Sequence, residues 1–163
     1  MAIASLQDLF IEQLGDLLDA EKQLVTSLPD MAEAASSSRL RQALEHYLRQ
    51  SEGQVQRLEQ AFNLIGVRAD QGDCTAMEGL VKEAGQVVND AGDPAVTDAG
   101  LIAAAQKVEP YQIASYGSAR TWAEELGNPH VAELLQTTLN EESAANEALI
   151  EIAESQVNAS AAR

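Results

Sequence analysis

The sequence is poor in the residues that build several common classes of protein. Its single cysteine, Cys74, excludes an intrachain disulfide and leaves the redox compartment unconstrained. Aromatic residues make up only 4% of the chain, and this scarcity, together with abundant alanine, favours packed helices over a β-sandwich. Basic residues number 10 against 26 acidic ones, giving a net charge of −16. Because phosphate binding needs clustered Lys and Arg, we expect no nucleic-acid partner.

Long apolar runs are missing as well. The longest, Leu101–Ala105 with small neighbours, is far short of the ~20 residues that span a bilayer. The first residues lack the basic segment of a signal peptide, and acids follow at Asp8 and Glu12. We therefore expect a cytoplasmic protein without a membrane partner. Its 163 residues are enough for one domain with a sizeable core.

The apolar residues that are present follow the period of a helix. They recur at three- and four-residue steps over 6–28 and again over 40–62, as on one face of a helix. Ser5 is the predicted N-cap of the first helix, which Pro29 kinks or ends. Gly66 is the predicted stop of the second helix.

Three further start signals divide the rest of the chain. Thr75-Ala76-Met77-Glu78 has the form of a capping box, with Thr75 as the cap. Asp93-Pro94 and Asn128-Pro129 each place a cap residue before a proline at the first helical position. These signals predict helices over about 75–89, 95–126 and 129–156, with Gly127 separating the last two.

Together these elements predict an all-α fold, a four-helix bundle. The segment 66–94 is a long crossover that carries a short extra helix between the second and third long helices. This is the connectivity of ferritin-like bundles. We predict one ferritin-like domain over 1–157 and a disordered tail over 158–163.

Each long helix also carries a glutamate on its apolar stripe. Glu21 lies three residues after Leu18 and three before Leu24, where an isolated charge is costly. Similar spacing selects the candidates on the other three helices: Glu52, Glu109 and Glu142. A bundle holds a carboxylate-bridged metal pair in this way, and oxygen ligands suit iron or manganese. The sequence therefore predicts a metal site, with iron as the ion and with manganese or no metal as alternatives.

A metal-free explanation of these acids stays open. The di-iron motif Glu-x-x-His is absent, and His46 and His130 are interpreted as surface or packing residues. Arg49 lies three residues before Glu52 and can neutralise an inward carboxylate in place of a metal. The alternative function is thus a non-catalytic homodimeric bundle that serves structure or interaction.

Some other residues are interpreted as structural. Tyr111, Tyr116 and Trp122 share the third long helix, and such an aromatic stripe is typical of a core. Cys74 precedes a helix N-terminus but has Asp73 and no basic residue beside it, so it is interpreted as a structural thiol.

Several longer motifs occur in an order and spacing typical of one family. They are Asp19-Ala20-Glu21-Lys22-Gln23-Leu24, Cys74-Thr75-Ala76-Met77-Glu78-Gly79-Leu80, Asp98-Ala99-Gly100-Leu101-Ile102-Ala103-Ala104-Ala105-Gln106-Lys107-Val108-Glu109, Ile113-Ala114-Ser115-Tyr116-Gly117, Ala123-Glu124-Glu125-Leu126-Gly127 and Leu139-Asn140-Glu141-Glu142. Over roughly 5–155 the chain resembles the YciF family of bacterial ferritin-like stress proteins. The resemblance implies a rubrerythrin-type bundle, a homodimer, a link to stress responses and inward acids at Glu21, Glu109 and Glu142.

The chain departs from that family at two places. Leu48-Arg49-Gln50-Ser51 stands where the family usually has Leu-Glu-Glu-Thr, and Glu109-Pro110-Tyr111-Gln112 stands where Glu-His-Tyr-Glu is usual. We therefore expect metal binding to be weakened, reduced to one site or lost. No nucleophilic triad, phosphate-binding loop or Cys-x-x-Cys pair indicates a substrate, so enzyme activity is left open.

Overall fold

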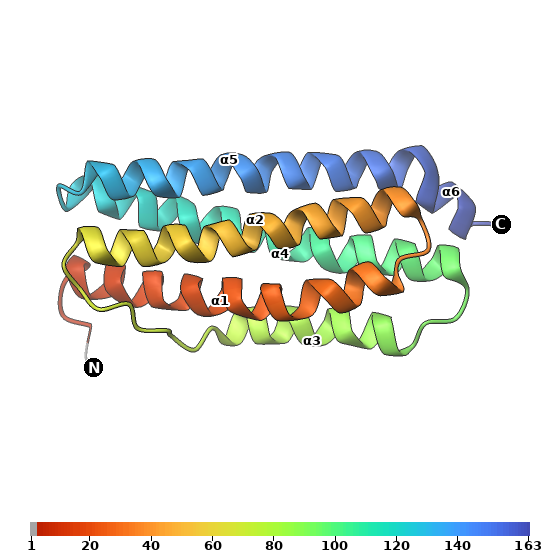
Figure 1. Cartoon of the computed structure of the whole chain (residues 1–163), viewed down its shortest axis with the longest axis horizontal. Coiled ribbons are helices and arrows are strands. Elements are labelled where there is room, and N and C mark those ends of the chain that lie inside the picture. Colours follow the sequence, from red (N-terminus) through yellow and green to blue (C-terminus); the bar gives the residue numbers. More distant parts are fainter. Residues whose placement is uncertain (1–2) are drawn as a thin grey trace.

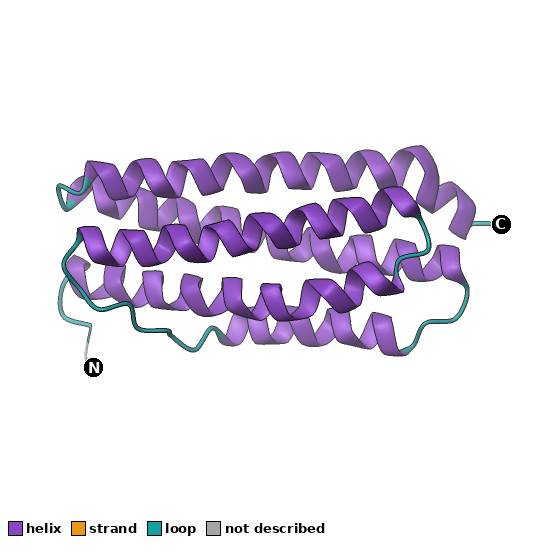
Figure 2. Cartoon of the chain, viewed as in Figure 1, coloured by secondary structure: helices purple, strands orange, loops and turns teal. Residues whose placement is uncertain are grey.

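The computed structural model describes residues 3–163, whose regular secondary structure is entirely helical (Figure 2). In chain order the elements are α1 (Leu6–Ala34), α2 (Ser38–Leu64), α3 (Thr75–Asn89), α4 (Pro94–Glu125), α5 (Pro129–Ile152), the π-helical turn η1 (Ala153–Val157) and α6 (Asn158–Ala161). The long helices α1, α2, α4 and α5 lie side by side, and α3 packs on α1 and α4 (Figure 1). This arrangement confirms the predicted all-α bundle with a short extra helix in the crossover between α2 and α4. Within residues 3–163, no helix has both the length and the apolar character needed to cross a membrane.

Side-chain caps fix the starts of three long helices, and on α2 the cap is Ser37, whose Oγ accepts a hydrogen bond from the Leu40 amide. Ser5 Oγ accepts a hydrogen bond from the Asp8 amide at 3.1 Å, and Asp93 Oδ1 accepts one from the Ala95 amide at 2.9 Å. Both predicted caps are confirmed. Asn128 precedes α5 as predicted, but its side chain makes no capping hydrogen bond. The local start signal that remains is Pro129 at the first helical position, where a proline is favoured.

The start of α3 differs from the prediction. Its N-cap is Cys74, whose sulfur accepts a hydrogen bond from the Met77 amide at 3.4 Å, and Thr75 is already helical. The predicted cap at Thr75 is therefore wrong. The reason lies outside the local sequence, because Asp19 Oδ2 of α1 accepts a hydrogen bond from the Cys74 amide at 2.8 Å and holds that residue at the helix start.

The helix ends combine confirmed and corrected predictions. Gly66 and Gly127 follow α2 and α4 with φ of 70° and 74°, a conformation that suits glycine after a helix. Helix α1 continues through Pro29 to Ala34, so the alternative in which Pro29 ends it is wrong. The C-terminal segment stays helical to Ala161, where a disordered tail was expected. Residues 1–2 of the predicted domain lie outside the described residues.

The buried apolar side chains form two clusters at different heights of the bundle. The first, here called the α3 core, contains Ala20, Leu24, Leu28, Met31, Ala32, Ala35, Leu40, Leu44, Tyr47, Cys74, Met77, Ala84, Leu101, Ile102, Ala104, Ala105, Val108, Leu149, Ile152, Ala153 and Val157. The second, here called the N-terminal core, contains Phe10, Leu14, Leu17, Leu18, Leu58, Ala61, Phe62, Tyr116, Ala119, Ala123, Val131, Ala132 and Leu135. All four long helices contribute to both cores.

Candidate metal centre

A set of buried polar side chains separates the two apolar cores along every long helix. This polar layer consists of Glu21 from α1, Ser51 and Gln54 from α2, Glu109 and Gln112 from α4, and Thr138 and Glu142 from α5. The helical period places it there. On α1, for example, Glu21 lies one turn after Leu17 of the N-terminal core and one turn before Leu24 of the α3 core.

The structure brings together three of the four predicted metal ligands. Glu21, Glu109 and Glu142 are all 0% exposed, and the charge of Glu142 acts on the pKa values of the other two. Glu52 is exposed on α2, so the prediction that it points inward is wrong. The inward positions of α2 belong instead to Ser51 and Gln54.

Arg49 does not neutralise the glutamates. Its side chain is exposed, and within residues 3–163 it forms no ion pair with a carboxylate. The prediction that Arg49 substitutes for a metal is therefore wrong. It fails for the same reason as the placement of Glu52, because both residues lie outside the inward face of α2.

Two neutral donors hold Glu21. Its Oε1 accepts hydrogen bonds from Tyr116 Oη at 2.6 Å and from Gln112 Nε2 at 2.7 Å. Burial and the charge of Glu142 raise the pKa of Glu21 well above its usual 4.5, against the lowering effect of these hydrogen bonds. The interior therefore disfavours an ionised Glu21 even with both donors in place.

Glu142 also contacts an amide and a hydroxyl group. Gln54 Nε2 donates to Oε1 at 2.7 Å, and Tyr47 Oη lies 3.2 Å from Oε2. Burial raises the pKa of Glu142 to about 7, although both hydrogen bonds lower it. Glu142 therefore titrates near neutral pH.

The Tyr47 hydroxyl adds an independent argument about protons. It lies 2.6 Å from Gln112 Oε1 as well as 3.2 Å from Glu142 Oε2, yet it has one hydrogen. When that hydrogen goes to the closer Gln112 oxygen, the contact with Glu142 needs a hydrogen from the carboxyl group. The hydrogen-bond count thus agrees with a protonated Glu142.

Glu109 differs from the other two glutamates because neither of its carboxyl oxygens has a hydrogen-bond partner. Burial, together with the charge of Glu142, raises the pKa of Glu109 to about 8. Other buried acceptors share its lack of partners. Within residues 3–163, the buried side-chain N and O atoms without a partner are all oxygens: Glu21 Oε2, Gln50 Oε1, Ser51 Oγ, Gln54 Oε1, and Glu109 Oε1 and Oε2.

An excess of buried acceptor oxygens is what an oxygen-liganded cation would satisfy. The donor set fits a single hard ion in its chemistry, with carboxylates from α1, α4 and α5 and amide oxygens from α2. The same side chains do not fit a dinuclear iron site, which needs two Glu-x-x-His pairs. Three residues after Glu109, where such a pair would have histidine, this chain has Gln112. Both histidines, His46 and His130, are exposed, as predicted for surface residues.

The carboxylates are not preassembled around an ion. Within residues 3–163, no three His, Cys, Asp or Glu side chains are arranged to hold a metal together. Both Glu21 and Glu142 are hydrogen-bonded to tyrosine and glutamine side chains. A cation at this centre would exchange some of these hydrogen bonds for ligand bonds.

Sequence reasoning missed several members of the site. Tyr47 lies within the apolar stripe predicted over 40–62, and Tyr116 within the aromatic stripe interpreted as core; both are buried, but their hydroxyls reach the glutamates. Ser51 and Gln54 carried a signal, because the series Leu44, Tyr47, Ser51, Gln54, Leu58 continues in steps of three and four residues. Polar residues within such a series are candidates for a buried site.

Cys74 and Tyr111 form a separate contact beside the site. The Cys74 sulfur lies 2.9 Å from Tyr111 Oη and also caps α3. Burial and the neighbouring thiol raise the pKa of Tyr111 above its usual range. These bonds tie α3 to α4 and agree with the structural thiol predicted from the sequence.

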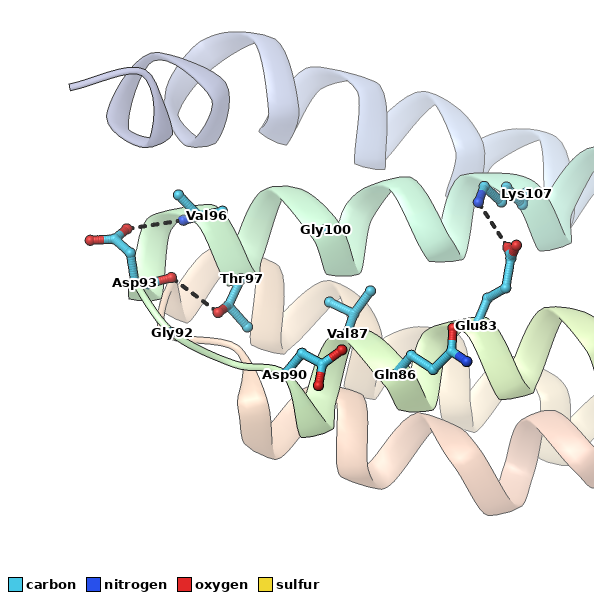
Figure 3. A pocket seen from close by; sticks show the side chains of 10 residues that line it. All are labelled: Glu83, Gln86, Val87, Asp90, Gly92, Asp93, Val96, Thr97, Gly100 and Lys107. Atoms are coloured by element: carbon cyan, nitrogen blue, oxygen red, sulfur yellow. Dashed lines mark hydrogen bonds and ion pairs between the residues drawn. The ribbon is translucent and has the colours of Figure 1, made fainter.

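An open groove between α3 and α4 is distinct from the polar layer. It has a volume of about 560 Å³, and none of its lining residues belongs to that layer (Figure 3). Lys107 Nζ pairs with Glu83 Oε2 at 2.8 Å across it, and Asp93 at its other end caps α4. Its charged groups therefore serve helix packing and capping.

Comparison with known proteins agrees with this architecture. The family model described as "Domain of unknown function (DUF892)" matches residues 5–162. Protein YciF of Escherichia coli (strain K12) is 42% identical over 159 residues, which are 97% of this chain and 96% of that protein.

Solved structures show the same similarity. The crystal structure of the E. coli stress protein YciF superposes with a TM-score of 0.92 over 96% of this chain and 99% of that one, at 42% identity. YcfI from Rhodopseudomonas palustris gives a TM-score of 0.87 at 41% identity, covering 90% and 94% of the two chains. A protein from Xanthomonas campestris pv. campestris shares the fold at 20% identity, with a TM-score of 0.77 and 95% of each chain covered. The bundle, its motifs and these matches together show that the chain belongs to the DUF892 family, the family of E. coli YciF.

Proposed function

We propose that this protein binds one hard divalent cation, Fe²⁺ or Mn²⁺, in the polar layer through Glu21, Glu109 and Glu142. The observation that carries the proposal is the set of buried oxygens without hydrogen-bond partners, which includes both carboxyl oxygens of Glu109. Unpaired carboxylates are costly in an apolar interior, and a bound cation removes that cost. Carboxylate and amide oxygens are the ligands that hard cations prefer.

The chain's own residues have defined roles in this proposal. Glu109 offers two free oxygens, and Gln112 and Tyr116 orient Glu21. Complete burial of the three glutamates separates the centre from bulk solvent. Bound iron would supply redox chemistry toward an oxidant, which is a chemistry suited to a stress response. Because the E. coli relative is called a stress protein, we extend the proposal to a role in bacterial stress.

A metal-free function is the second candidate, and a specific observation favours it. Side-chain amides and hydroxyls already contact Glu21 and Glu142, and the two contacts of the Tyr47 hydroxyl agree with a protonated Glu142. The polar layer would then be a neutral hydrogen-bonded network inside a bundle that serves structure or interaction. Homodimerisation and a cytoplasmic location stay predictions in both cases.

Metal analysis separates the two functions. The protein is purified without chelator or metal-binding tag, and iron, manganese and zinc are measured per chain before and after anaerobic loading with Fe²⁺ or Mn²⁺. We expect about one ion per chain, as an all-oxygen centre of this size can hold. Glu109→Gln should abolish binding, whereas Glu52→Gln, which changes an exposed glutamate, should leave it unchanged.

The contrary outcomes are equally distinct. Two ions per chain would overturn the single-ion assignment. No ion after loading, or equal binding by the Glu109→Gln and Glu52→Gln variants, would exclude the proposed centre and leave the metal-free bundle.

A further inference from the structure

One charged cluster at the surface is connected to the polar layer. Arg57 of α2 and Glu141 of α5 form an ion pair with 2.9 Å between Arg57 Nη2 and Glu141 Oε1. Their side chains are 19% and 27% exposed, whereas the other ion pairs of residues 3–163 have at least one partner about half exposed or more. The pair is thus the most enclosed one in the described chain.

The Arg57 guanidinium is surrounded by oxygens. Besides Glu141 Oε1 it donates to Glu141 Oε2 at 3.0 Å and to Thr138 Oγ1 at 2.7 Å. Two carboxylate oxygens and a hydroxyl oxygen around one positive group are a donor set that a hard cation can also use. The guanidinium therefore stands where a cation could first bind.

A single side-chain amide links this cluster with the buried glutamates. Gln54 Nε2 donates to Glu141 Oε2 at 3.0 Å and to Glu142 Oε1 at 2.7 Å. Gln54 and Glu142 are 0% exposed, whereas Glu141 reaches solvent. The Gln54 carbonyl oxygen is buried without a partner, so it adds an acceptor beside this path.

The cluster lies on the side of the bundle that α3 does not cover. Arg57 and Glu141 lie on α2 and α5, while α3 covers the bundle on α1 and α4 (Figure 1). Within residues 3–163, only one side chain that donates to Glu21 or Glu142 also contacts a partly exposed charged group, and it is Gln54.

We propose that Glu141 and Thr138 form an outer binding site from which a divalent cation passes to the buried glutamates, and that Arg57 occupies this site in the ion-free protein. The inference rests on the proposed function. An incoming ion displaces the guanidinium from Glu141, and the carboxylate then delivers the ion past Gln54 to Glu142. Glu141 and Arg57 thus control the rate of loading, whereas the buried glutamates determine how much ion is bound.

Rapid mixing with Mn²⁺ tests this division of roles. The decay of the electron paramagnetic resonance signal of free Mn²⁺ gives the rate of uptake, and titration calorimetry gives the stoichiometry. Charged groups that concentrate an ion change association rates by about tenfold or more. We therefore expect Glu141→Gln to slow uptake about tenfold and Arg57→Met to speed it about tenfold, with the stoichiometry unchanged.

Matched variants make the result specific. Arg120→Met and Glu124→Gln alter an ion pair with 32% and 52% exposed side chains on α4 and should leave the rate as in the original chain. Glu141→Asp keeps the charge and should restore most of the rate. If Arg57→Met does not fold by circular dichroism, the Glu141→Gln and Glu141→Asp variants carry the test.

A failure of the outer site and a failure of the buried metal centre give different results. Normal stoichiometry with unchanged uptake rates in the Glu141 variants would overturn the outer site and leave the buried centre standing. Absence of Mn²⁺ binding by the original chain at equilibrium would overturn both the proposed function and this inference.

Discussion

The polar layer and the two apolar cores are built on the same helices with the same spacing, yet they contribute to the fold in opposite ways. Leu17 and Leu24 are buried one turn on either side of Glu21, and each removes apolar surface from water. Glu21 is buried just as completely, but its burial carries a cost that two hydrogen bonds offset only in part. The apolar cores thus supply the stability that lets the bundle hold an unfavourable polar layer, and in that layer a ligand can bind.

Truncation within the cores should have the largest effect. Leu14→Ala in the N-terminal core and Leu44→Ala in the α3 core remove fully buried side chains, and each should lower the free energy of unfolding by about 2–5 kcal/mol. Ser51→Ala in the polar layer should cost less than about 1 kcal/mol, because its hydroxyl has no partner in the described chain. Urea unfolding measures the free energy of unfolding of all three variants. A decrease for Ser51→Ala as large as that for the leucine variants would show that the polar layer stabilises the fold as much as the apolar cores do.

The polar layer should make the metal-free protein less stable as pH rises. Glu109 has a pKa of about 8 in the folded state against 4.5 as the ordinary value, so between these values the folded protein holds a proton that the unfolded chain has released. Stability contributed by that proton is therefore full below pH 4.5 and is lost up to about pH 8, at about 1.4 kcal/mol per pH unit for each such proton. Glu142 has a pKa of about 7, so it lowers the free energy of unfolding further as pH rises to about 7.

Chemical unfolding at a series of pH values checks this slope with excess chelator present. Glu109→Gln cannot release a proton and should flatten the dependence, while the exposed control Glu52→Gln should not. Stability that rises from pH 5 to pH 8 in the original chain would contradict the raised pKa values.

Metal affinity should depend on pH in the opposite sense. Since the ion binds carboxylates and not carboxylic acids, it must displace the protons of Glu109 and Glu142 below their pKa values of about 8 and about 7. The dissociation constant for Mn²⁺ should fall about tenfold per pH unit for each proton released, and should level off above about pH 8. Calorimetric titration in buffers of different ionisation enthalpy gives both the constant and the proton count. An affinity for Mn²⁺ that does not change with pH would show that the ion does not bind to Glu109 and Glu142.

An effect smaller than that of the leucine truncations is expected at Cys74, where α3 begins. Cys74→Ala removes the cap of α3 and the contact with Tyr111, and should cost about 0.5–2 kcal/mol. Cys74→Ser keeps an acceptor at the cap and should retain more of the stability. Thermal unfolding compares the two variants, and equal melting temperatures for Ala and Ser would show that the cap contributes nothing.

The sequence predicts the fold well because the fold depends on local signals. The caps at Ser5 and Asp93 and the glycines after α2 and α4 act within a few residues, and the structure confirms them. The start of α3 was misplaced because its decisive hydrogen bond comes from Asp19, far away in the sequence. Signals of that kind are absent from a local pattern.

The candidate site was predicted in part for a similar reason. Glu21, Glu109 and Glu142 lie in stripes whose apolar neighbours are buried, so spacing locates them correctly. Glu52 was selected from Leu48 and Val55, which are themselves only half-buried and mark the edge of the stripe. Hydrophobic spacing shows that a residue faces the bundle but does not distinguish the centre of a face from its edge.

The polar layer also has a consequence for how the chain finds its native alignment. Apolar stripes alone allow neighbouring helices to slide by one turn, because one leucine replaces another in the contact. A one-turn slide of α1 would move Glu21 from its tyrosine and glutamine donors into one of the leucine-rich cores. Burying an unpaired carboxyl group there costs several kcal/mol. The polar layer therefore disfavours shifted alignments of the helices. It favours the one alignment in which the polar residues of all four long helices lie at the same height in the bundle.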